Sequence, residues 1–253
     1  MCIRDSHKID TGGIDFDVVM EDVQTLNTWS LDNRLDISKI SYGVWPLLQS
    51  DYRLLDSGGA LGMGVGPLLV SAKPVSIKEI DHSTVAIPGI NTTAHLLFSL
   101  AFPGAAKKEF MVFSDIEDAI LNGKTAAGVI IHENRFTYQQ KGLLKVMDLG
   151  EYWQETTGSP IPLGGIVMKK SLPAELCEQV DILIRSSVEF AFTNYPVLPA
   201  YVKEHASEMN DEVMRMHIDL YVNKYSVSLG DEGIRAIGIL LDVYRKLHGE
   251  ISV

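Results

Sequence analysis

The chain has 253 residues, of which 46% are hydrophobic and 22% charged, a composition typical of a globular protein with one large or two small domains. Its formal net charge of −11 argues against nucleic acid and anionic membrane surfaces as partners, although N–H groups at helix starts could still hold a small anion. No apolar run approaches the roughly 18 residues that span a bilayer, and Cys2 and Cys177 stand in contexts that indicate neither a disulfide framework nor a zinc site.

The opening of the chain does not fit the rest. Residues 1–6, Met-Cys-Ile-Arg-Asp-Ser, are neither a signal peptide nor a capped helix. They resemble translated adapter sequence at the head of some metagenomic reading frames. We therefore expect that the native sequence begins near His7 and that an upstream piece, with a strand of the first domain, is absent.

Strand and helix patterns alternate from there on. Hydrophobic residues at every second position of 14–20 predict a strand, 21–35 predicts a helix, and 35–41 predicts a strand that ends at Ser41. The glycine-rich stretch 57–66 is followed by Pro67 and a strand, whereas a dinucleotide fingerprint needs a helix there. We interpret this stretch as a flexible turn that lets backbones approach closely and is compatible with a hinge.

The middle and the end of the chain show clear helix signals. Asn91-Thr92-Thr93 can cap a helix from Ala94, and Ser114–Glu117 predicts a capping box for a helix that ends near Leu121. One further strand is predicted to end near 131, and another is predicted at 166–168 after a lead-in at 160–165. Helices are predicted from 172 to Pro196, at the charged stretch 204–215, and around 237–247. Strands 67–70 and 166–168 bracket the middle section, which predicts two α/β domains, residues 1–70 plus 166–253 and residues 71–165.

His132 is the most informative position. The apolar run Val129-Ile130-Ile131 predicts a buried strand of a parallel sheet, and ligands gather at the carboxyl ends of such strands. An imidazole with a pKa of about 6.5 is a proton acceptor at neutral pH. A structural histidine at a strand end gives the same local pattern. A zinc helix motif would need histidine at 136, where Phe136 stands, so a metal site is not expected.

Other candidate ligand contacts are ambiguous when each is taken alone. The start of the helix at Thr92-Thr93-Ala94 offers N–H groups and hydroxyls to a carboxylate, but simple capping explains it as well. Ser41 at a strand end has the same ambiguity, and Asn27 could be an exposed or capping residue. Cys177 is interpreted as a small buried hydrophobic residue.

Taken together, an ordered set of motifs carries a resemblance. The chain resembles the 1,4-dihydroxy-6-naphthoate synthases, menaquinone-pathway enzymes of the futalosine route, from about His7 to near the C-terminus. The motifs are Glu-Asp-Val-Gln-Thr-Leu-Asn at 21–27, Lys-Ile-Ser-Tyr at 39–42, the glycine-rich stretch from 57 with Gly-Pro-Leu-Leu-Val at 66–70, Pro-Gly at 88–89 with Thr-Thr-Ala at 92–94, Ile-Ile-His-Glu at 130–133 with Arg-Phe-Thr-Tyr at 135–138, Asp-Leu-Gly at 148–150 and Pro-Ile-Pro-Leu-Gly at 160–164.

The resemblance implies a two-domain type 2 periplasmic-binding-protein-like fold, with a small anionic substrate in the cleft between the domains. It implies conversion of cyclic dehypoxanthine futalosine to 1,4-dihydroxy-6-naphthoate with release of a three-carbon fragment, no cofactor, and a cytoplasmic setting. The histidine of the Ile-Ile-His-Glu motif is the family's general base, so His132 inherits that role. The positions that match the lining of the family's pocket are Asn27, Ser41, Thr92, Thr93, Ala94, Ile131 and Leu163. The family's opening strand and its Ser-Pro-Cys-Pro-Asn-Asp-Thr loop are not present here.

Two alternatives share the expected fold. A solute-binding protein would bind without chemistry and would not need a base at its cleft. The sister chorismate dehydratase of the same pathway is the second, and the stretches at 130–133 and 160–164 favour the synthase over it. The sequence does not indicate an oligomeric state.

Overall fold

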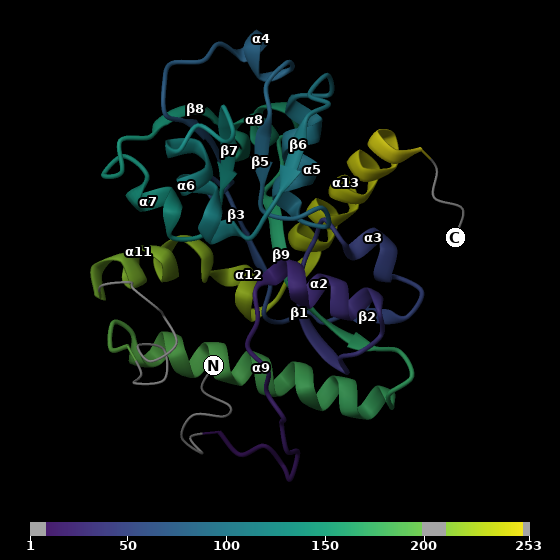
Figure 1. Cartoon of the computed structure of the whole chain (residues 1–253). Coiled ribbons are helices and arrows are strands. Elements are labelled where there is room, and N and C mark those ends of the chain that lie inside the picture. Colours follow the sequence, from purple (N-terminus) through teal and green to yellow (C-terminus); the bar gives the residue numbers. More distant parts are fainter. Residues whose placement is uncertain (1–8, 199–210, 250–253) are drawn as a thin grey trace.

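The protein forms two β-sheets, each covered by helices, one above the other (Figure 1). The computed structural model describes residues 9–198 and 211–249. Residues 1–8, with the predicted adapter sequence and Cys2, and residues 204–210 of the predicted charged helix lie outside the described residues.

The first sheet is antiparallel and has the long strand β9 at its centre. β1 pairs with one edge of β9, while β2 and β3 pair with its other edge at opposite ends. Its strands are β1 (Ile37–Ser41), β2 (Tyr52–Leu54), β3 (Ala60–Gly62) and β9 (Ile161–Lys169). The predicted lead-in at 160–165 is wrong, because residues 161–165 already pair with β1 and β3 as part of β9.

The second sheet has the order β6-β5-β7-β4-β8 and mixes strand directions. β5 runs parallel to β6 and β7, and β4 runs antiparallel to β7 and β8. Its strands are β4 (Leu68–Ser71), β5 (Val85–Ile87), β6 (Lys108–Phe110), β7 (Ala127–Ile130) and β8 (Leu144–Asp148). The predicted strand of a parallel sheet is β7, which runs parallel to β5 on one side but antiparallel to β4 on the other, because β4 enters from the first sheet in the opposite direction. The boundaries of the two predicted domains stay a prediction.

Helices cover both sheets and fill the space between them. They are α2 (Val23–Leu31), α3 (Trp45–Leu48), α4 (Ile77–Ile80), α5 (Thr93–Ala101), the short 3₁₀ helix η1 (Phe113–Asp115), α6 (Ile116–Leu121), α7 (Asn134–Thr137), α8 (Leu149–Thr157), α9 (Ala174–Asn194), α11 (Asp211–Tyr221), α12 (Lys224–Val227) and α13 (Gly230–His248). In Figure 1, α2 and α9 lie with the first sheet, α6, α7 and α8 with the second, and α11 lies at the level between them.

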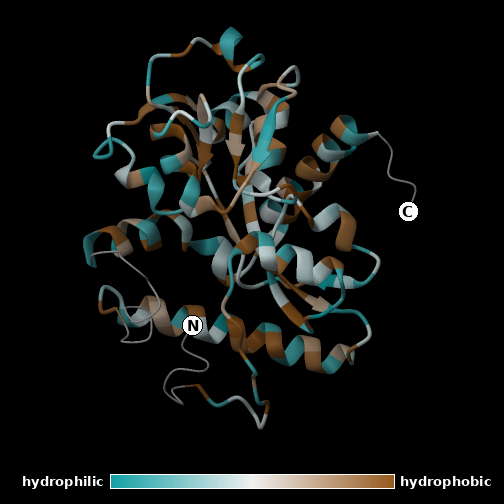
Figure 2. Cartoon of the chain, viewed as in Figure 1, coloured by the Kyte–Doolittle hydropathy of each residue, from teal (hydrophilic) through white to brown (hydrophobic). Residues whose placement is uncertain are grey.

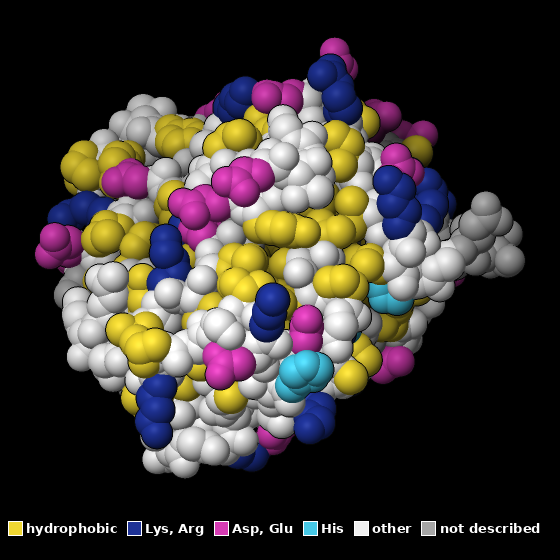
Figure 3. Space-filling model, turned by 90° about the horizontal axis from the view of Figure 1, so that it is seen from above, with side chains coloured by type: hydrophobic (Ala, Val, Ile, Leu, Met, Phe, Trp, Pro, Cys, Tyr) yellow, Lys and Arg dark blue, Asp and Glu magenta, His cyan; other side chains and the backbone are white. Residues whose placement is uncertain are grey.

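The hydrophobic core follows the periodicity of these elements. α9 buries Cys177, Val180 and Ile184, at helical spacing, against Ile166 and Met168 of β9, which confirms the interpretation of Cys177. Figure 2 shows that most strands are hydrophobic along their middle, whereas the edge strand β6 is hydrophilic. Most helices have one hydrophobic and one hydrophilic side. On the face seen in Figure 3, acidic and basic side chains are interspersed around hydrophobic ones. No helix among the described residues is long and apolar enough to cross a bilayer.

Two local predictions are wrong. Residues 14–20 are not a strand: Ile14 and Phe16 pack against the cluster formed by α9 and β9, but no neighbouring strand pairs with their backbone. Helix α6 begins near the predicted place but without a capping box, because the Ser114 hydroxyl donates to the Asp115 carboxylate instead of capping the helix.

Candidate active site

His132 follows β7 at the carboxyl end of the strand, as the sequence predicted. Its backbone lies in the left-handed region, with φ of +55°, which few residues other than glycine adopt, although asparagine, aspartate and histidine do so more often than the rest. This conformation turns the chain from β7 towards α7, and such strain is often found at functional sites. The edge of the Phe113 ring contacts the imidazole, with ring centroids 5.2 Å apart.

A second imidazole faces His132 from α11. The ring centroids of His132 and His217 lie 6.1 Å apart, and the ring planes differ by 12°. The ring of Tyr221, one turn later on the same helix, packs against the His217 ring, with ring centroids 4.6 Å apart. No hydrogen bond joins the His132 ring to any other described residue, so its nitrogens are free to accept a proton.

His132 is neutral at physiological pH. Burial, together with the positive charge of Lys39, lowers its pKa to about 4. Lys39 itself has a pKa lowered to about 8 by the protein around it, and its ammonium donates to the Gly58 carbonyl at 2.8 Å, yet the side chain remains accessible to solvent. Lys39 is thus an exposed basic side chain whose positive charge acts on His132.

The two histidines predict how stability changes with pH. Burial also lowers the pKa of His217 to about 4, with a further lowering from His132 and an opposing effect of Glu133. Between pH 6.5 and 4 the unfolded chain therefore binds protons that the folded chain does not, and stability should fall as the pH falls through this window. Urea unfolding at pH 7 and pH 4.5 measures the loss.

Because carboxylates titrate in the same range, the comparison is with a variant. The double substitution His132→Asn with His217→Gln should lose less stability between the two pH values than the unsubstituted chain. An equal loss in both proteins would contradict the assignment of the two imidazoles as neutral.

Ser41, Thr93 and Leu163 form one hydrogen-bonded cluster. The Thr93 N–H donates to Ser41 Oγ at 2.7 Å, the two hydroxyl oxygens lie 3.0 Å apart, and Thr93 Oγ1 donates to the Leu163 carbonyl at 3.0 Å. Ser41 and Lys39 stand two residues apart on β1, so their side chains point to the same face of the sheet. Lys39 thus connects this cluster with the surroundings of His132.

The other predicted contact residues have mainly internal partners. Thr92 caps α5, accepting from the His95 N–H and donating to the Gly89 carbonyl. Ala94 is buried in the core, and Ile131 packs partly buried against it. A ligand that uses any of these residues must replace or extend contacts that are already made.

The buried side chain of Asn27 joins α2 to β1 and to the start of α5 by hydrogen bonds. Its side chain is fully buried, its amide donates to the Asn91 carbonyl at 2.9 Å, and its oxygen accepts from the Ser41 N–H at 3.0 Å. Because both ends of the amide are used, its role as a ligand contact stays a prediction.

Asn27→Asp should lower the free energy of unfolding by about 2–4 kcal/mol at pH 8, because an ionised carboxylate cannot donate to the Asn91 carbonyl. A buried carboxyl that faces the Asn91 carbonyl has a raised pKa, so its protonated form, which can donate to that carbonyl, returns as the pH falls. The difference from the unsubstituted chain should therefore be smaller at pH 5 than at pH 8 in urea titrations.

Asn33→Asp is the matched control, since Asn33 is exposed and aspartate also tolerates its left-handed backbone. A loss of unfolding free energy at Asn27 no larger than that at Asn33 would mean that the hydrogen bonds of Asn27 do not stabilise the end of β1.

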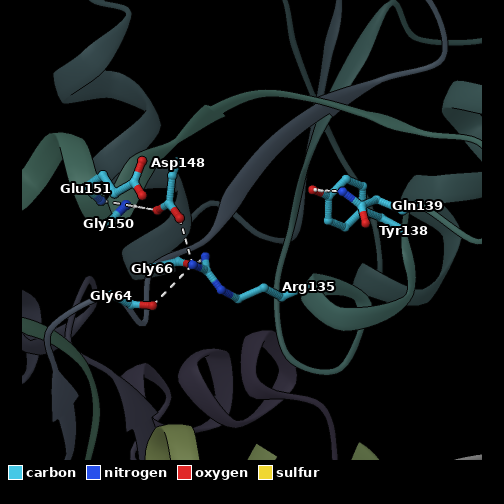
Figure 4. A network of polar contacts seen from close by, with 8 residues as sticks. All are labelled: Gly64, Gly66, Arg135, Tyr138, Gln139, Asp148, Gly150 and Glu151. Atoms are coloured by element: carbon cyan, nitrogen blue, oxygen red, sulfur yellow. Dashed lines mark hydrogen bonds and ion pairs between the residues drawn. The ribbon is translucent and has the colours of Figure 1, made fainter. Parts of the chain in front are cut away.

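Arg135 anchors the segment that carries His132 (Figure 4). Its guanidinium donates to the Gly66 carbonyl, to the Gly64 carbonyl at 3.1 Å and to the Asp148 carboxylate at 2.6 Å. Asp148 also caps α8 by accepting from the N–H groups of Gly150 and Glu151. The arginine therefore ties the glycine-rich stretch, the start of α8 and the turn after His132 together.

The close approach predicted for the glycine-rich stretch is confirmed at one point. A Cβ on Gly66 would lie 2.2 Å from the Gly150 Cα, so neither position has room for a side chain. The stretch is bonded at Gly64 and Gly66 rather than free, and part of it is the strand β3. Its proposed flexibility stays a prediction.

A separate cavity of about 220 Å³ lies between α5 and α13. It shares only Thr92 with the predicted site residues; its lining also includes His95, Ser99, Tyr244 and His248. His132 is not part of this lining, so the catalytic role of His132 stays a prediction.

Sequence reasoning missed His217, Tyr221 and Lys39. The charged stretch 204–215 predicts a helix that ends before His217, although His217 and Tyr221 are four residues apart and share one face of α11. That pair was the available signal. Nothing local indicates that this face meets the end of β7.

Comparison with known proteins shows the family of this chain. A family model described as menaquinone biosynthesis matches residues 5–246. A 1,4-dihydroxy-6-naphthoate synthase of Thermus thermophilus is 42% identical over 222 residues, 88% of this chain and 80% of that protein. The corresponding synthase of Streptomyces coelicolor is 41% identical over 230 residues, 89% of this chain and 81% of that protein.

Solved structures show the fold. A crystal structure of a protein from Archaeoglobus fulgidus has a TM-score of 0.85 at 31% identity, covering 92% of this chain and 86% of that one. The ligand-binding component of an ABC-type import system from Staphylococcus aureus has a TM-score of 0.64 at 10% identity, covering 88% of this chain and 78% of that one. The two-domain binding-protein-like fold is thus confirmed, and the match over nearly the whole length shows that this chain belongs to the menaquinone biosynthesis family.

Proposed function

We propose that this protein is a 1,4-dihydroxy-6-naphthoate synthase, a carbon–carbon lyase that converts cyclic dehypoxanthine futalosine to 1,4-dihydroxy-6-naphthoate and a three-carbon fragment. Identity of 41–42% to two proteins of that name supports the activity. The observation that carries the mechanism is the neutral His132 imidazole at the end of β7, close enough to Lys39 to be affected by its positive charge.

His132 acts as the general base. The unprotonated ring takes a carbon-bound proton of the substrate, and the C–H electron pair forms the new double bond of the first elimination. A positioned base typically contributes 10²–10⁴-fold to the rate. The aromatic ring that forms draws the later eliminations forward, so we expect no cofactor.

The substrate is anionic, and the cluster around β1 supplies groups that suit it. Lys39 offers a positive charge, and the hydroxyls of Ser41 and Thr93 lie at the start of α5, where the helix dipole favours an anion. A carboxylate that binds there replaces the bond between the two hydroxyls with bonds to itself. Because the pathway makes a precursor of a membrane quinone from soluble intermediates, we place the enzyme in the cytoplasm.

Purified protein incubated with cyclic dehypoxanthine futalosine tests the proposal. We expect the naphthoate chromophore to appear without added metal or organic cofactor, and no product from chorismate. Consumption of chorismate instead would identify the sister dehydratase. Binding of cyclic dehypoxanthine futalosine without turnover would identify a solute-binding protein of the same fold.

A further inference from the structure

His217 has no structural partner that explains its position. Its Nδ1 is buried without a hydrogen bond, and its ring lies nearly parallel to that of His132, 6.1 Å away. Such an atom is rare in folded proteins and requires an explanation. The ring also packs against Tyr221 on the same helix, and no hydrogen bond of the described residues joins it to another element.

The unpartnered Nδ1 identifies the tautomer. A buried N–H without an acceptor costs more than a buried lone pair without a donor, so the proton of the neutral ring lies on Nε2. Nε2 is not buried, and no hydrogen bond of the described residues uses it. His217 therefore presents an unused N–H donor next to the proposed base.

We propose that His217 is a second catalytic residue, whose Nε2–H donates a hydrogen bond to the substrate oxygen that becomes negative when His132 removes the carbon-bound proton. The inference rests on the proposed function, because it assigns a role in that reaction.

The step balances without another reactant. His132 takes the proton and becomes an imidazolium, and the C–H electron pair moves into a new double bond, pushing charge onto an adjacent oxygen that His217 stabilises. The bond to the leaving fragment then breaks, and the fragment takes the bonding pair and a proton from His132. His217 keeps its proton throughout, and both rings end as they began.

A neutral donor suits this place better than a cation would. An imidazolium at 217 would disfavour the positive charge that His132 must accept, whereas a neutral imidazole leaves His132 basic. Burial holds His217 in the neutral form, and the charged or titratable groups that face it are His132, Glu133 and Tyr221. Neutral histidines with a lowered pKa are known in other enzymes to donate a hydrogen bond to a substrate oxygen on which negative charge develops.

Two variants separate donation from packing. His217→Phe keeps a ring against Tyr221 and removes the donor, and we expect it to lower kcat 10²–10³-fold, with less than about threefold change in the dissociation constant of cyclic dehypoxanthine futalosine. His217→Gln keeps an N–H donor and should retain kcat within about tenfold of the unsubstituted protein. Should the phenylalanine variant not fold, His217→Met, which also lacks a donor, replaces it.

Proton exchange supplies a second readout. If His217 stabilises the charge formed by proton removal, exchange of the substrate's carbon-bound proton in D₂O should slow in His217→Phe by the same factor as turnover. A role of His217 in a later step alone would slow turnover without slowing exchange. The control is His248→Phe on α13. His248 stacks on Tyr244, which is also four residues away in the sequence, with ring centroids 4.1 Å apart, and it takes no part in the proposed reaction. The turnover of this variant should not change.

The outcomes distinguish this inference from the proposed function. Unchanged turnover in His217→Phe, or equal losses in the phenylalanine and glutamine variants, would overturn the role of His217 while His132→Asn still tests the base. Absence of turnover in the unsubstituted protein would overturn the proposed function, and the inference would fall with it.

Discussion

His132→Asn should lower kcat by two to four orders of magnitude and leave the affinity for cyclic dehypoxanthine futalosine nearly unchanged. Asparagine tolerates the left-handed backbone, which has φ of +55° at this position, but it cannot accept a proton at neutral pH. Steady-state turnover together with equilibrium binding of the same substrate measures the two effects. Turnover near that of the unsubstituted protein would rule out His132 as the base.

A glycine at the same position sharpens the test. His132→Gly removes the imidazole and suits a positive φ, so the backbone keeps its path. Added imidazole should then restore part of the lost turnover in a concentration-dependent way, while it should have no such effect on His132→Asn, in which the space is partly filled. His132→Ala adds backbone strain to the loss of the base and is therefore the less informative variant.

The second large effect concerns stability. Arg135→Met should lower the free energy of unfolding by about 3–5 kcal/mol, because it leaves a buried carboxylate without its counter-charge and the Gly66 carbonyl without its donor. The Asp148 side chain is only 3% exposed and that of Arg135 only 16%, so water cannot easily replace the guanidinium beside Asp148. Urea unfolding monitored by tryptophan fluorescence measures the loss.

Arg185→Met is the matched control. Arg185 also pairs with a carboxylate, that of Asp56 at 2.9 Å, but both side chains are more than one third exposed. Such a pair contributes about 0–1 kcal/mol, and its loss should be correspondingly small. Similar losses at Arg135 and Arg185 would mean that the buried network does not hold the turn after His132.

The local patterns predicted the elements that depend on neighbours in the sequence. The helical spacing of buried residues in α9 and α13, the Thr92 cap of α5 and the apolar run of β7 each specify one element and the face it buries. The position of His132 at a strand end follows from that run alone. The resemblance supplied the fold and the remaining site residues.

Pairings across long sequence distances could not be predicted in this way. The alternation at 14–20 is a strand pattern, but a strand forms only where a partner backbone is available, and here Ile14 and Phe16 pack without one. The mixed direction of the second sheet depends on where β4 enters it. The meeting of His132 and His217 depends on the docking of α11, which no local pattern encodes.

The bonds of Arg135 also limit where the protein can bend. A pivot between two lobes needs backbone torsions that are free to rotate, and the segment before β4 is tied at Gly64 and Gly66 while its backbone presses on Gly150. We therefore expect this connection to stay fixed to the start of α8 and to the turn after His132. An opening that admits substrate should then bend the chain at the other links between the sheets.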